Sequence, residues 1–268
     1  MTSNGHILTN YHVVDNAELI TVLLQDGRLF NAEIIGSDQV TDLALLKIDA
    51  ENLPAIPQDP DLEAQVGDIV LAIGNPLNLG QTITQGIISA TGQKGLSSSN
   101  SSHSDFIQMD AAINIGNSGG ALVNSRGVLV GINTAKAQRG VQGIFFAIPY
   151  KLAKHITDRL LADGEVTRGY LGLDGSPINQ DGVFVKSSVE SIAGIKITNV
   201  DPFGPAWTGG LRTGDVMLAI NGKQLVSFQE LLNIIENTTP GDHIKISLSR
   251  GEVIMNKNVQ VGKLEIGN

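Results

Sequence analysis

Three residues that could together activate a nucleophile lie far apart in the chain. The stretch GNSGG at residues 116–120 holds Ser118 between glycines, His12 lies in TNYHVV, and Asp42 lies in TDLALLKI. A serine hydroxyl attacks a carbonyl only when a base takes its proton and donors face the oxyanion that forms. Glycines allow the turn to aim backbone N–H groups at one point. The pattern indicates nucleophilic attack by Ser118, with His12 as the base and Asp42 as its partner.

Two other interpretations of this stretch need weighing. Taken alone, a serine in a glycine turn is more often a plain turn residue than a nucleophile. Residues 116–120 also satisfy G-x-S-x-G, the nucleophile elbow of α/β-hydrolases, which requires a helix straight after the serine and a histidine downstream. Here ALVNSRGVLVGINT alternates like a hairpin, and the histidines that follow are His155 and His243. The order histidine, aspartate, serine matches instead the double β-barrel proteases of the chymotrypsin type.

The elements that must position these residues are short strands and one closing helix. Apolar or β-branched runs, broken by turns, predict four strands before a proline-bearing linker at 52–68 and six after it. They cover residues 6–14, 19–24, 29–38, 43–48, 68–74, 81–92, 106–110, 120–124, 128–134 and 144–149. Residues 149–163 have helical spacing, with Pro149 at the start and Gly164 past the end. Two barrels of similar size would require two more strands in the first group, so we expect the chain to begin inside its first barrel.

A second, smaller domain is expected after residue 166, where strand-like runs begin to alternate with helical segments. IKITNV, VMLAINGK and HIKISLS are typical of strands, and Ser227 with Glu230 forms a capping box before an apolar helix. We expect a mainly β protein with two domains. Residues 1–165 would form a double Greek-key β-barrel that lacks N-terminal strands, and residues 168–268 would form a small α+β domain.

Composition excludes several classes of protein. The net charge of −9 disfavours a nucleic-acid partner, because binding to phosphates requires a basic face. The sequence has no apolar run long enough to cross a bilayer and no signal peptide at its start. The chain is therefore expected to be cytoplasmic, or its targeting segment lies outside this sequence. The absence of cysteine excludes disulfides, thiol catalysis and cysteine-ligated zinc.

A family resemblance adds to this interpretation. TNYHVV, TDLALLKI and DAAINIGNSGGALVNSRGVLVGINT resemble the bacterial HtrA serine proteases, densely over residues 5–165 and more loosely through RGYLGL into a domain that looks like a PDZ domain. The resemblance implies that His12 is the general base, that Asp42 orients it and that Ser118 attacks the scissile carbonyl. It also implies an oxyanion hole made by the N–H groups of Gly116 and Ser118, which Asn117 would steer.

The resemblance further implies where substrate and ligand would bind. An extended substrate would add a strand beside Thr134, Ala135 and Lys136. The side chain before the cut would enter an apolar pocket lined by Ala112, Ile113, Asn114 and Ile144. In the PDZ domain, the carboxylate of a peptide would be held by Tyr170, Leu171, Gly172 and Leu173. The resemblance implies no metal and no organic cofactor.

The implied function is that of an ATP-independent serine endopeptidase of the bacterial envelope stress response. Such an enzyme cleaves an extended or unfolded protein segment, for example in an anti-sigma factor, and C-terminal peptides of misfolded envelope proteins bind its PDZ domain and regulate it. The resemblance implies a periplasmic location, a homotrimer in the full-length form, and membrane contact through a segment that this chain lacks. The alternative is a catalytically silent peptide-binding protein, because the first barrel is incomplete.

Two residues suggest how this chain differs from its relatives and from digestive proteases. The family usually has GIGFAIP where this chain has GIFFAIP, so the ring of Phe145 would either narrow the pocket or block a strand contact. Digestive proteases mature by pairing a new N-terminal amine with an aspartate beside the nucleophile, a position that the uncharged Asn117 occupies here. Activation by rearrangement of loops, among them a short loop at 135–143, is therefore expected rather than removal of a propeptide.

Overall fold

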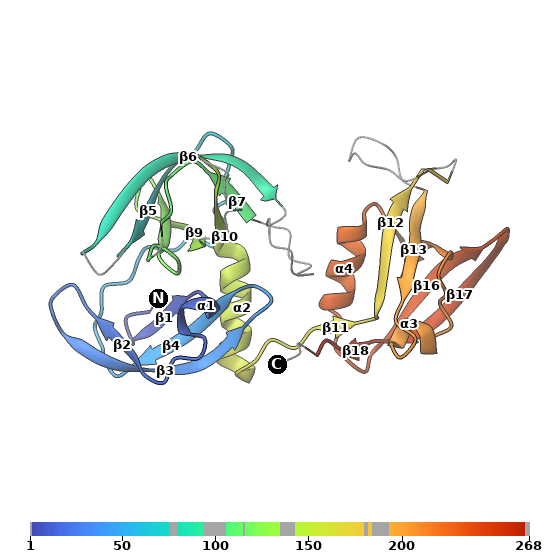
Figure 1. Cartoon of the computed structure of the whole chain (residues 1–268), viewed down its shortest axis with the longest axis horizontal. Helices are drawn as coiled ribbons and strands as arrows, with labels where there is room; N and C mark the ends of the chain where they lie inside the picture. The colour runs from blue at the N-terminus through green and yellow to red at the C-terminus, as the bar shows by residue number, and fades with distance from the viewer. Residues whose placement is uncertain are drawn as a thin grey trace. The chain divides into compact units, whose positions relative to one another are not determined.

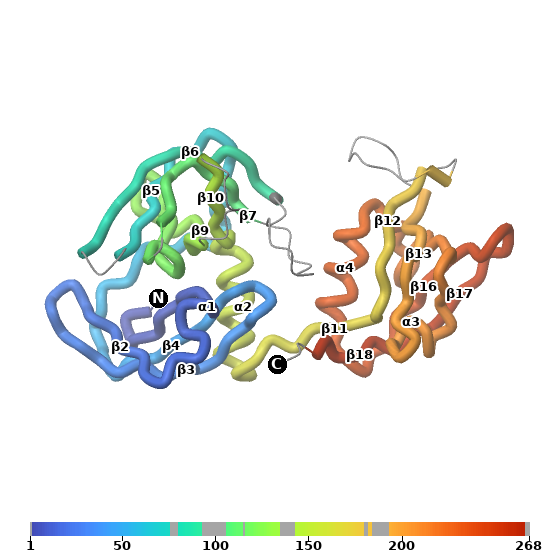
Figure 2. The backbone as a smooth tube through the Cα atoms, viewed as in Figure 1, coloured from blue at the N-terminus to red at the C-terminus, as the bar shows by residue number. Residues whose placement is uncertain are grey.

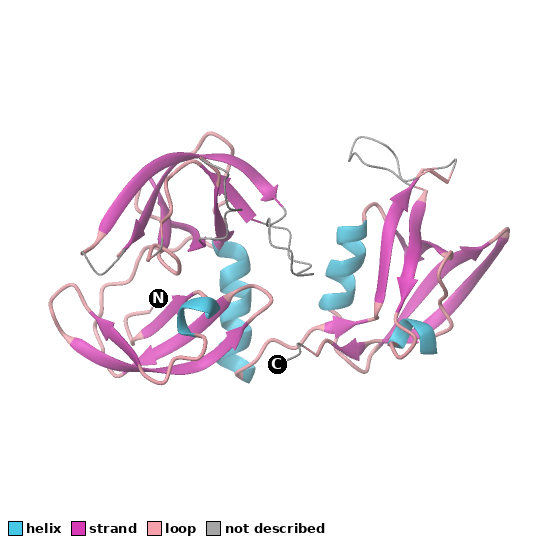
Figure 3. Cartoon of the chain, in the orientation of Figure 1, coloured by secondary structure: helices cyan, strands magenta, loops and turns pink. Residues whose placement is uncertain are grey.

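The computed structural model describes residues 2–75, 80–93, 106–114, 116–134, 143–179, 182–183 and 193–265. The chain divides into two compact units, Met1–Val166 and Thr167–Asn268. Strands predominate in both units (Figure 3). In the part of the chain that the structure describes, no helix has the length and apolarity needed to cross a membrane.

The first unit opens with a four-stranded antiparallel sheet in the order β1-β4-β3-β2. Its strands are β1 (His6–Thr9), β2 (Ile20–Leu23), β3 (Leu29–Asp38) and β4 (Leu43–Ile48). The central strand β4 is apolar on both faces, because Leu43 and Leu45 pack on one side while Ala44 and Leu46 pack on the other. The short helix α1 (Tyr11–Val14) contributes Val14 to that second side. This sheet is open, with β1 and β2 at its edges.

The second half of this unit is a closed barrel in the order β10-β7-β6-β5-β8-β9. Its strands are β5 (Ile69–Gly74), β6 (Thr82–Gln93), β7 (Phe106–Met109), β8 (Ala121–Asn124), β9 (Leu129–Thr134) and β10 (Phe145–Pro149). Figure 2 shows the chain completing the open sheet before it enters the barrel. Within the described residues, an open sheet of four strands followed by a closed barrel of six confirms the sequence prediction of a mainly β fold whose first half is not a closed barrel.

The helix α2 (Tyr150–Asp163) joins the open sheet to the barrel (Figure 1). Ile156 and Leu160 on its buried face pack in one cluster with Leu45 of β4 and Ile148 of β10. The helix ends at Gly164, which has a φ of 74° and whose N–H donates to the carbonyl of Leu160. The predicted helix over 149–163 is therefore confirmed to within one residue.

The second unit is built around the sheet β12-β13-β14-β16-β17, with the short β15 also paired to β14. These strands are β12 (Leu173–Ile178), β13 (Gly194–Val200), β14 (Val216–Ile220), β15 (Lys223–Gln224), β16 (His243–Arg250) and β17 (Val253–Gln260). A separate pair joins β11 (Gly169–Tyr170) to β18 (Gly262–Lys263). The helices are α3 (Pro205–Thr208) and α4 (Phe228–Glu236). Half of the predicted capping box is present, since Ser227 Oγ accepts from the N–H of Glu230 at 3.0 Å. The side chain of Glu230 accepts from the N–H of Val226 at 2.9 Å, one residue before the cap.

One strand prediction is wrong in a way that matters for the site. The sequence predicts a single strand over residues 6–14, but the strand ends at Thr9 and residues 11–14 form a helical turn. The side-chain amide of Asn10 and the N–H of Tyr11 both donate to the carbonyl of Asp42, at 2.9 and 3.1 Å. These two bonds turn the chain away from the sheet immediately before His12.

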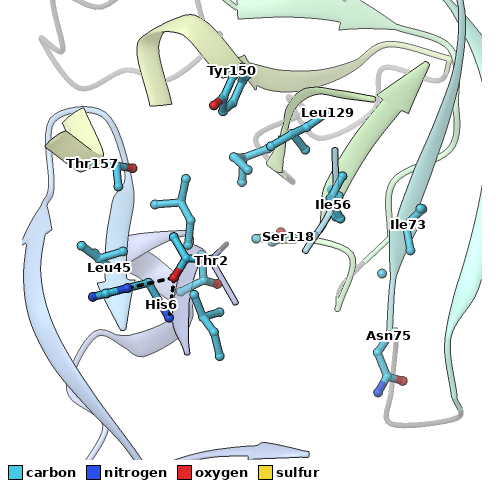
Figure 4. A pocket seen from close by; sticks show the side chains of 18 of the residues that line it. Thr2, His6, Leu45, Ile56, Ile73, Asn75, Ser118, Leu129, Tyr150 and Thr157 are labelled. Atoms are coloured by element: carbon cyan, nitrogen blue, oxygen red, sulfur yellow. Dashed lines mark hydrogen bonds between the residues drawn. The ribbon is translucent and has the colours of Figure 1, made fainter. Parts of the chain in front are cut away.

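A cavity of about 890 Å³ lies within the first unit. Its wall combines apolar side chains of the open sheet, the barrel and α2 with the loop that carries Ser118 (Figure 4). The apolar side chains include Leu8 and Leu45 of the sheet, Ile73, Leu129 and Ile132 of the barrel, Leu161 of α2, and Ile56 from the segment that links β4 to β5. The open sheet therefore leaves apolar surface uncovered beside the candidate nucleophile.

Candidate active site

His12 and Asp42 form a close pair in the first unit. The ring Nδ1 of His12 lies 2.9 and 2.8 Å from the two carboxylate oxygens of Asp42, and the backbone N–H of His12 donates to Oδ1 at 3.1 Å. The aspartate side chain is 5% exposed, whereas that of the histidine is 42% exposed. The buried carboxylate thus fixes the Nδ1 edge of the ring, while the other edge remains accessible to a reactant.

The backbone of Asp42 is held in an uncommon conformation. Its φ is 59°, in the left-handed region that a residue other than glycine, asparagine or aspartate rarely adopts. Its carbonyl accepts from Asn10 and Tyr11, and its Oδ2 also lies 3.4 Å from Thr134 Oγ1. This network places the carboxylate beside His12 and explains why an aspartate can occupy the turn before β4.

The loop of Ser118 lies directly against the segment that precedes His12. A Cβ added to Gly119 would fall inside contact distance of Thr9 Oγ1 and 3.0 Å from the backbone nitrogen of Asn10. The N–H of Gly119 donates to the carbonyl of Asn133 at 2.9 Å, and the next residue, Thr134, touches Asp42. Ser118 is therefore connected through its neighbours to the two elements that hold His12 and Asp42.

The turn GNSGG needs its glycines for close packing. Gly116 and Gly119 have φ values of 98° and 78°, and a Cβ on Gly120 would collide with the carbonyl oxygen of Ile73. Asn117 is 1% exposed, and its side-chain oxygen accepts from Thr82 Oγ1 at 3.5 Å. The side chain beside the nucleophile is thus buried in the barrel as a neutral amide.

Ser118 lines the cavity and is half-buried (Figure 4). The strand β8 begins three residues after it, so no helix follows the serine. This overturns the nucleophile elbow of α/β-hydrolases as an interpretation of G-x-S-x-G, because the elbow depends on a strand, a sharp turn and a helix in succession.

The predicted pocket residues lie in the segment before this turn and at the start of β10. Ala112 is half-buried and its carbonyl accepts from Thr84 Oγ1 at 2.8 Å, while Ile113 is 6% exposed and packs in the barrel core. Asn114 is exposed and Ile144 is half-buried at the entrance to β10. Of the predicted substrate-pairing residues, Thr134 is buried beside Asp42, and Ala135 and Lys136 lie outside the described residues. The roles assigned to them stay predictions.

The four residues of the expected carboxylate loop follow one another from β11 into β12. The carbonyl of Leu171 accepts from Ala206 and that of Gly172 from Asp201, both at 2.8 Å. Because a trans peptide places its N–H opposite its carbonyl, the N–H groups of Gly172 and Leu173 point away from those partners. Gly172 has a φ of 73°, which a glycine adopts without strain. These two N–H groups are the donors that the predicted carboxylate site would use, and that role stays a prediction.

Tyr170, the first residue of that loop, donates a hydrogen bond through its hydroxyl to Asp201 Oδ2 at 3.3 Å. Burial and the neighbouring carboxylate of Asp201 both raise the pKa of this phenol. The ring therefore stays neutral under ordinary conditions and braces the segment between β13 and α3. A role in binding through its backbone stays a prediction.

Comparison with known proteins identifies the family. Residues 1–132 match the trypsin-like peptidase domain, and residues 169–261 match the PDZ domain. The chain is 44% identical to the serine endoprotease DegS of Salmonella typhimurium, over all of this chain and 76% of that protein. The chain belongs to the HtrA family of serine endoproteases. It is also 45% identical to DegS of Escherichia coli K12, over 94% of the chain and 72% of that protein.

Solved structures of HtrA relatives have the same fold. The HtrA-type protease AlgW with a tripeptide aligns with a TM-score of 0.90 at 42% identity, covering 100% of this chain and 88% of that one. A serine endoprotease from Yersinia pestis aligns with a TM-score of 0.83 at 44% identity, covering 99% of this chain and 87% of the other. The resemblance stated from the sequence motifs is therefore confirmed for the whole chain.

Sequence reasoning missed the residues that support the triad. Asn133 is fully buried, and its side-chain amide donates to the carbonyls of Ile73 and Ala121 at 3.2 and 3.0 Å. It thereby fixes the end of β9 against the strands on either side of the Ser118 turn. A polar residue inside the buried strand LVGINT was the available signal, since a buried amide needs partners.

Proposed function

We propose that this HtrA-family serine endoprotease cleaves an extended protein segment through Ser118, His12 and Asp42. The observation that carries the proposal is the buried carboxylate of Asp42 bound to the Nδ1 edge of His12, in a unit where the Ser118 turn packs on the residues before that histidine. Such a carboxylate keeps the proton on Nδ1, so the opposite nitrogen can accept one from the serine.

The reaction follows from these positions. His12 takes the hydroxyl proton as Ser118 attacks the scissile carbonyl, and the tetrahedral oxyanion is met by the N–H groups of Ser118 and Gly116. The proton then passes from His12 to the leaving amine, and a water molecule deprotonated by the same ring releases the acyl group. Asp42 stabilises the imidazolium formed in both steps. The glycines of the turn provide the close backbone approach that these donors need.

The pocket for the residue before the cut would be small. Phe145 pairs with Met109 across β10 and β7, so its ring lies on the same face as that buried side chain and packs against the barrel core. Ile113, which precedes the Ser118 turn, belongs to the same core cluster. A phenyl ring at this end of the barrel occupies room that a glycine would leave open, so we propose that the enzyme prefers a small apolar residue at this position.

We propose that the PDZ domain binds the C-terminal carboxylate of a regulatory peptide and that the enzyme works in the periplasm during envelope stress. The support is the pair of N–H groups at Gly172 and Leu173, which point away from the neighbouring bonds, together with the relatives, among which DegP of Escherichia coli is named a periplasmic serine endoprotease. By the same family resemblance, we propose an anti-sigma factor as substrate, peptides of misfolded envelope proteins as regulators, and a homotrimer as the full-length form.

The test is a cleavage assay with purified protein and an unfolded protein substrate, with and without an acetylated peptide that has a free carboxylate. The proposal predicts cleavage that rises with the peptide and is lost in Ser118→Ala. Peptide binding without any cleavage would instead support the catalytically silent alternative. That alternative rests on the first sheet, which has four strands and is open.

A further inference from the structure

The peptide-binding edge of the PDZ domain contains a proline, Pro177. Among the described strands, β12 is the edge of its sheet, with β13 on one side and the helix α4 packed near the other (Figure 1). It follows directly on the carboxylate loop, so a peptide whose last residue is held at Gly172 and Leu173 would run back along β12 as an added antiparallel strand. The hydrogen-bonding groups on this edge decide how far that strand can extend.

The pairing with β13 shows which groups of β12 point outward. Gly175 lies opposite Ile197, whose N–H donates to Asp215 and whose carbonyl accepts from Gly214, both toward β14. Since Ile197 turns both groups toward β14, Gly175 and Ile197 form a non-hydrogen-bonded pair, and the N–H and carbonyl of Gly175 face the outer edge.

The register with β13 shifts between Asp174 and Gly175, so the outward groups before and after Gly175 are placed by separate observations. The carbonyl of Gly172 accepts from Asp201 on the β13 side, so the next residue, Leu173, turns its groups outward. Pro177, opposite Ile195, lies two residues beyond Gly175 and is outward as well. The edge therefore offers a donor at Leu173 and at Gly175, and at Pro177 it offers a ring carbon where the next donor would be.

We propose that Pro177 ends strand addition, so that the PDZ groove recognises the last four residues of a C-terminal peptide and nothing before them. With the terminal residue beside Leu173, the third residue from the end pairs with Gly175 and the fifth meets Pro177. The proline ring offers no N–H to the carbonyl of that fifth residue and pushes the peptide backbone away from the edge. This inference rests on the proposed binding of a C-terminal carboxylate at the same loop.

The side chains of β12 and α4 agree with a short apolar ligand. Leu173 and Phe228 are partly buried against the PDZ core, and Leu231 and Ile235 of α4 lie within that core. A Cβ on Gly175 would lie 3.1 Å from the ring of Phe228, so this ring packs over the face of β12 at Gly175. The ligand class is therefore a free C-terminus with an apolar last residue, read over a short segment.

The test measures how affinity depends on peptide length with the full chain. Acetylated peptide pools with a free carboxylate, ending in Val, Leu or Phe and containing two, four, six or eight residues, are titrated by calorimetry. We expect affinity to rise about tenfold or more from two residues to four, as the bonds to Gly175 form, and then to stay level. A further rise of fivefold or more between four and six residues would overturn the inference.

A variant supplies the missing donor. Pro177→Ala should leave the affinity for four-residue peptides unchanged. It should raise the affinity for six-residue peptides about two- to tenfold, because the alanine N–H adds one hydrogen bond to the peptide. Ser176→Ala is the matched control, because the backbone groups of Ser176 face β13, and it should change neither affinity. The length series on the unaltered protein decides the question even if Pro177→Ala fails to fold. Loss of all peptide binding would refute the proposed carboxylate site as well, whereas binding with a gain beyond four residues refutes the role of Pro177 alone.

Discussion

Replacing Asp42 with asparagine tests the pair that orients the catalytic histidine. Asparagine has the same shape and tolerates the φ of 59°, so the turn before β4 should survive. Its amide, however, places an NH₂ group or a neutral oxygen opposite the Nδ1 of His12, which a carboxylate oxygen now approaches at 2.8 Å. The ring can then carry its proton on the nitrogen that must accept one from Ser118.

The expected loss is large. A histidine held in the wrong tautomer lowers the rate by about 10,000-fold, which is about 5.4 kcal/mol of transition-state stabilisation at about 1.36 kcal/mol per factor of ten. Stability should fall by about 1–3 kcal/mol, since the hydrogen bonds to the backbone N–H of His12 and to Thr134 lose a charged acceptor.

The assay is kcat/KM on an unfolded protein substrate or a peptide amide, with thermal unfolding measured in parallel. Asp38→Asn is the matched control, because Asp38 is also buried and accepts from Thr41 in the same turn but does not contact His12 in the described network. We expect Asp38→Asn to lower stability while kcat/KM of the folded fraction falls by less than about tenfold. A kcat/KM for Asp42→Asn within tenfold of that of the unaltered enzyme would refute the assigned role of Asp42.

Three further predictions concern packing, specificity and pH. Gly119→Ala should reduce cleavage, and the reaction of Ser118 with a serine-directed fluorophosphonate, by about a hundredfold or more, because its Cβ would collide with Thr9. It should also lower the melting temperature. Activity equal to that of the unaltered enzyme would show that the Ser118 turn does not pack against Thr9. Phe145→Gly should shift the cleavage preference toward larger apolar residues by about tenfold or more in a peptide library, and an unchanged preference would remove the ring from the pocket. Burial tends to raise the pKa of Asp215, but hydrogen bonds from Arg250 and a backbone N–H outweigh it and hold that pKa below its ordinary value. The lowered pKa means that ionised Asp215 adds to the free energy of unfolding above the unfolded pKa of about 4, and that this gain is lost as the pH falls through the folded pKa. The PDZ unit should therefore lose stability in acid below about pH 4. Asp215→Asn should flatten that dependence when chemical unfolding is measured across pH.

Much of the first unit could be predicted from the sequence, because its strands carry their own signals. The runs at 29–38 and 43–48 match β3 and β4 residue for residue. The first run alternates between apolar and polar residues over most of its length, the second is apolar except for Lys47, and turn residues separate the two. The triad candidates followed from residue type and order, and the structure places His12 against Asp42.

The parts that escaped prediction depend on contacts between distant residues. The helical turn at His12 forms because Asn10 and Tyr11 bind the carbonyl of Asp42, some thirty positions along the chain, and no local pattern reports such a bond. The strand β17 was missed because VIMNKNVQ is largely exposed and has no continuous apolar pattern. Its pairing with β16 along its full length stabilises it as a strand. The outward donors of β12 likewise became visible through the register with β13.

The most direct test of the central claim is labelling of the purified chain with a serine-directed fluorophosphonate, followed by mass spectrometry of the modified peptide. If the triad is as proposed, the label attaches to Ser118, and both Ser118→Ala and His12→Ala abolish it, while His155→Ala labels at the unaltered rate. Labelling of Ser118 at the same rate in His12→Ala, or no labelling of the folded chain with a C-terminal peptide present, would contradict the assignment of His12 as the base that activates Ser118.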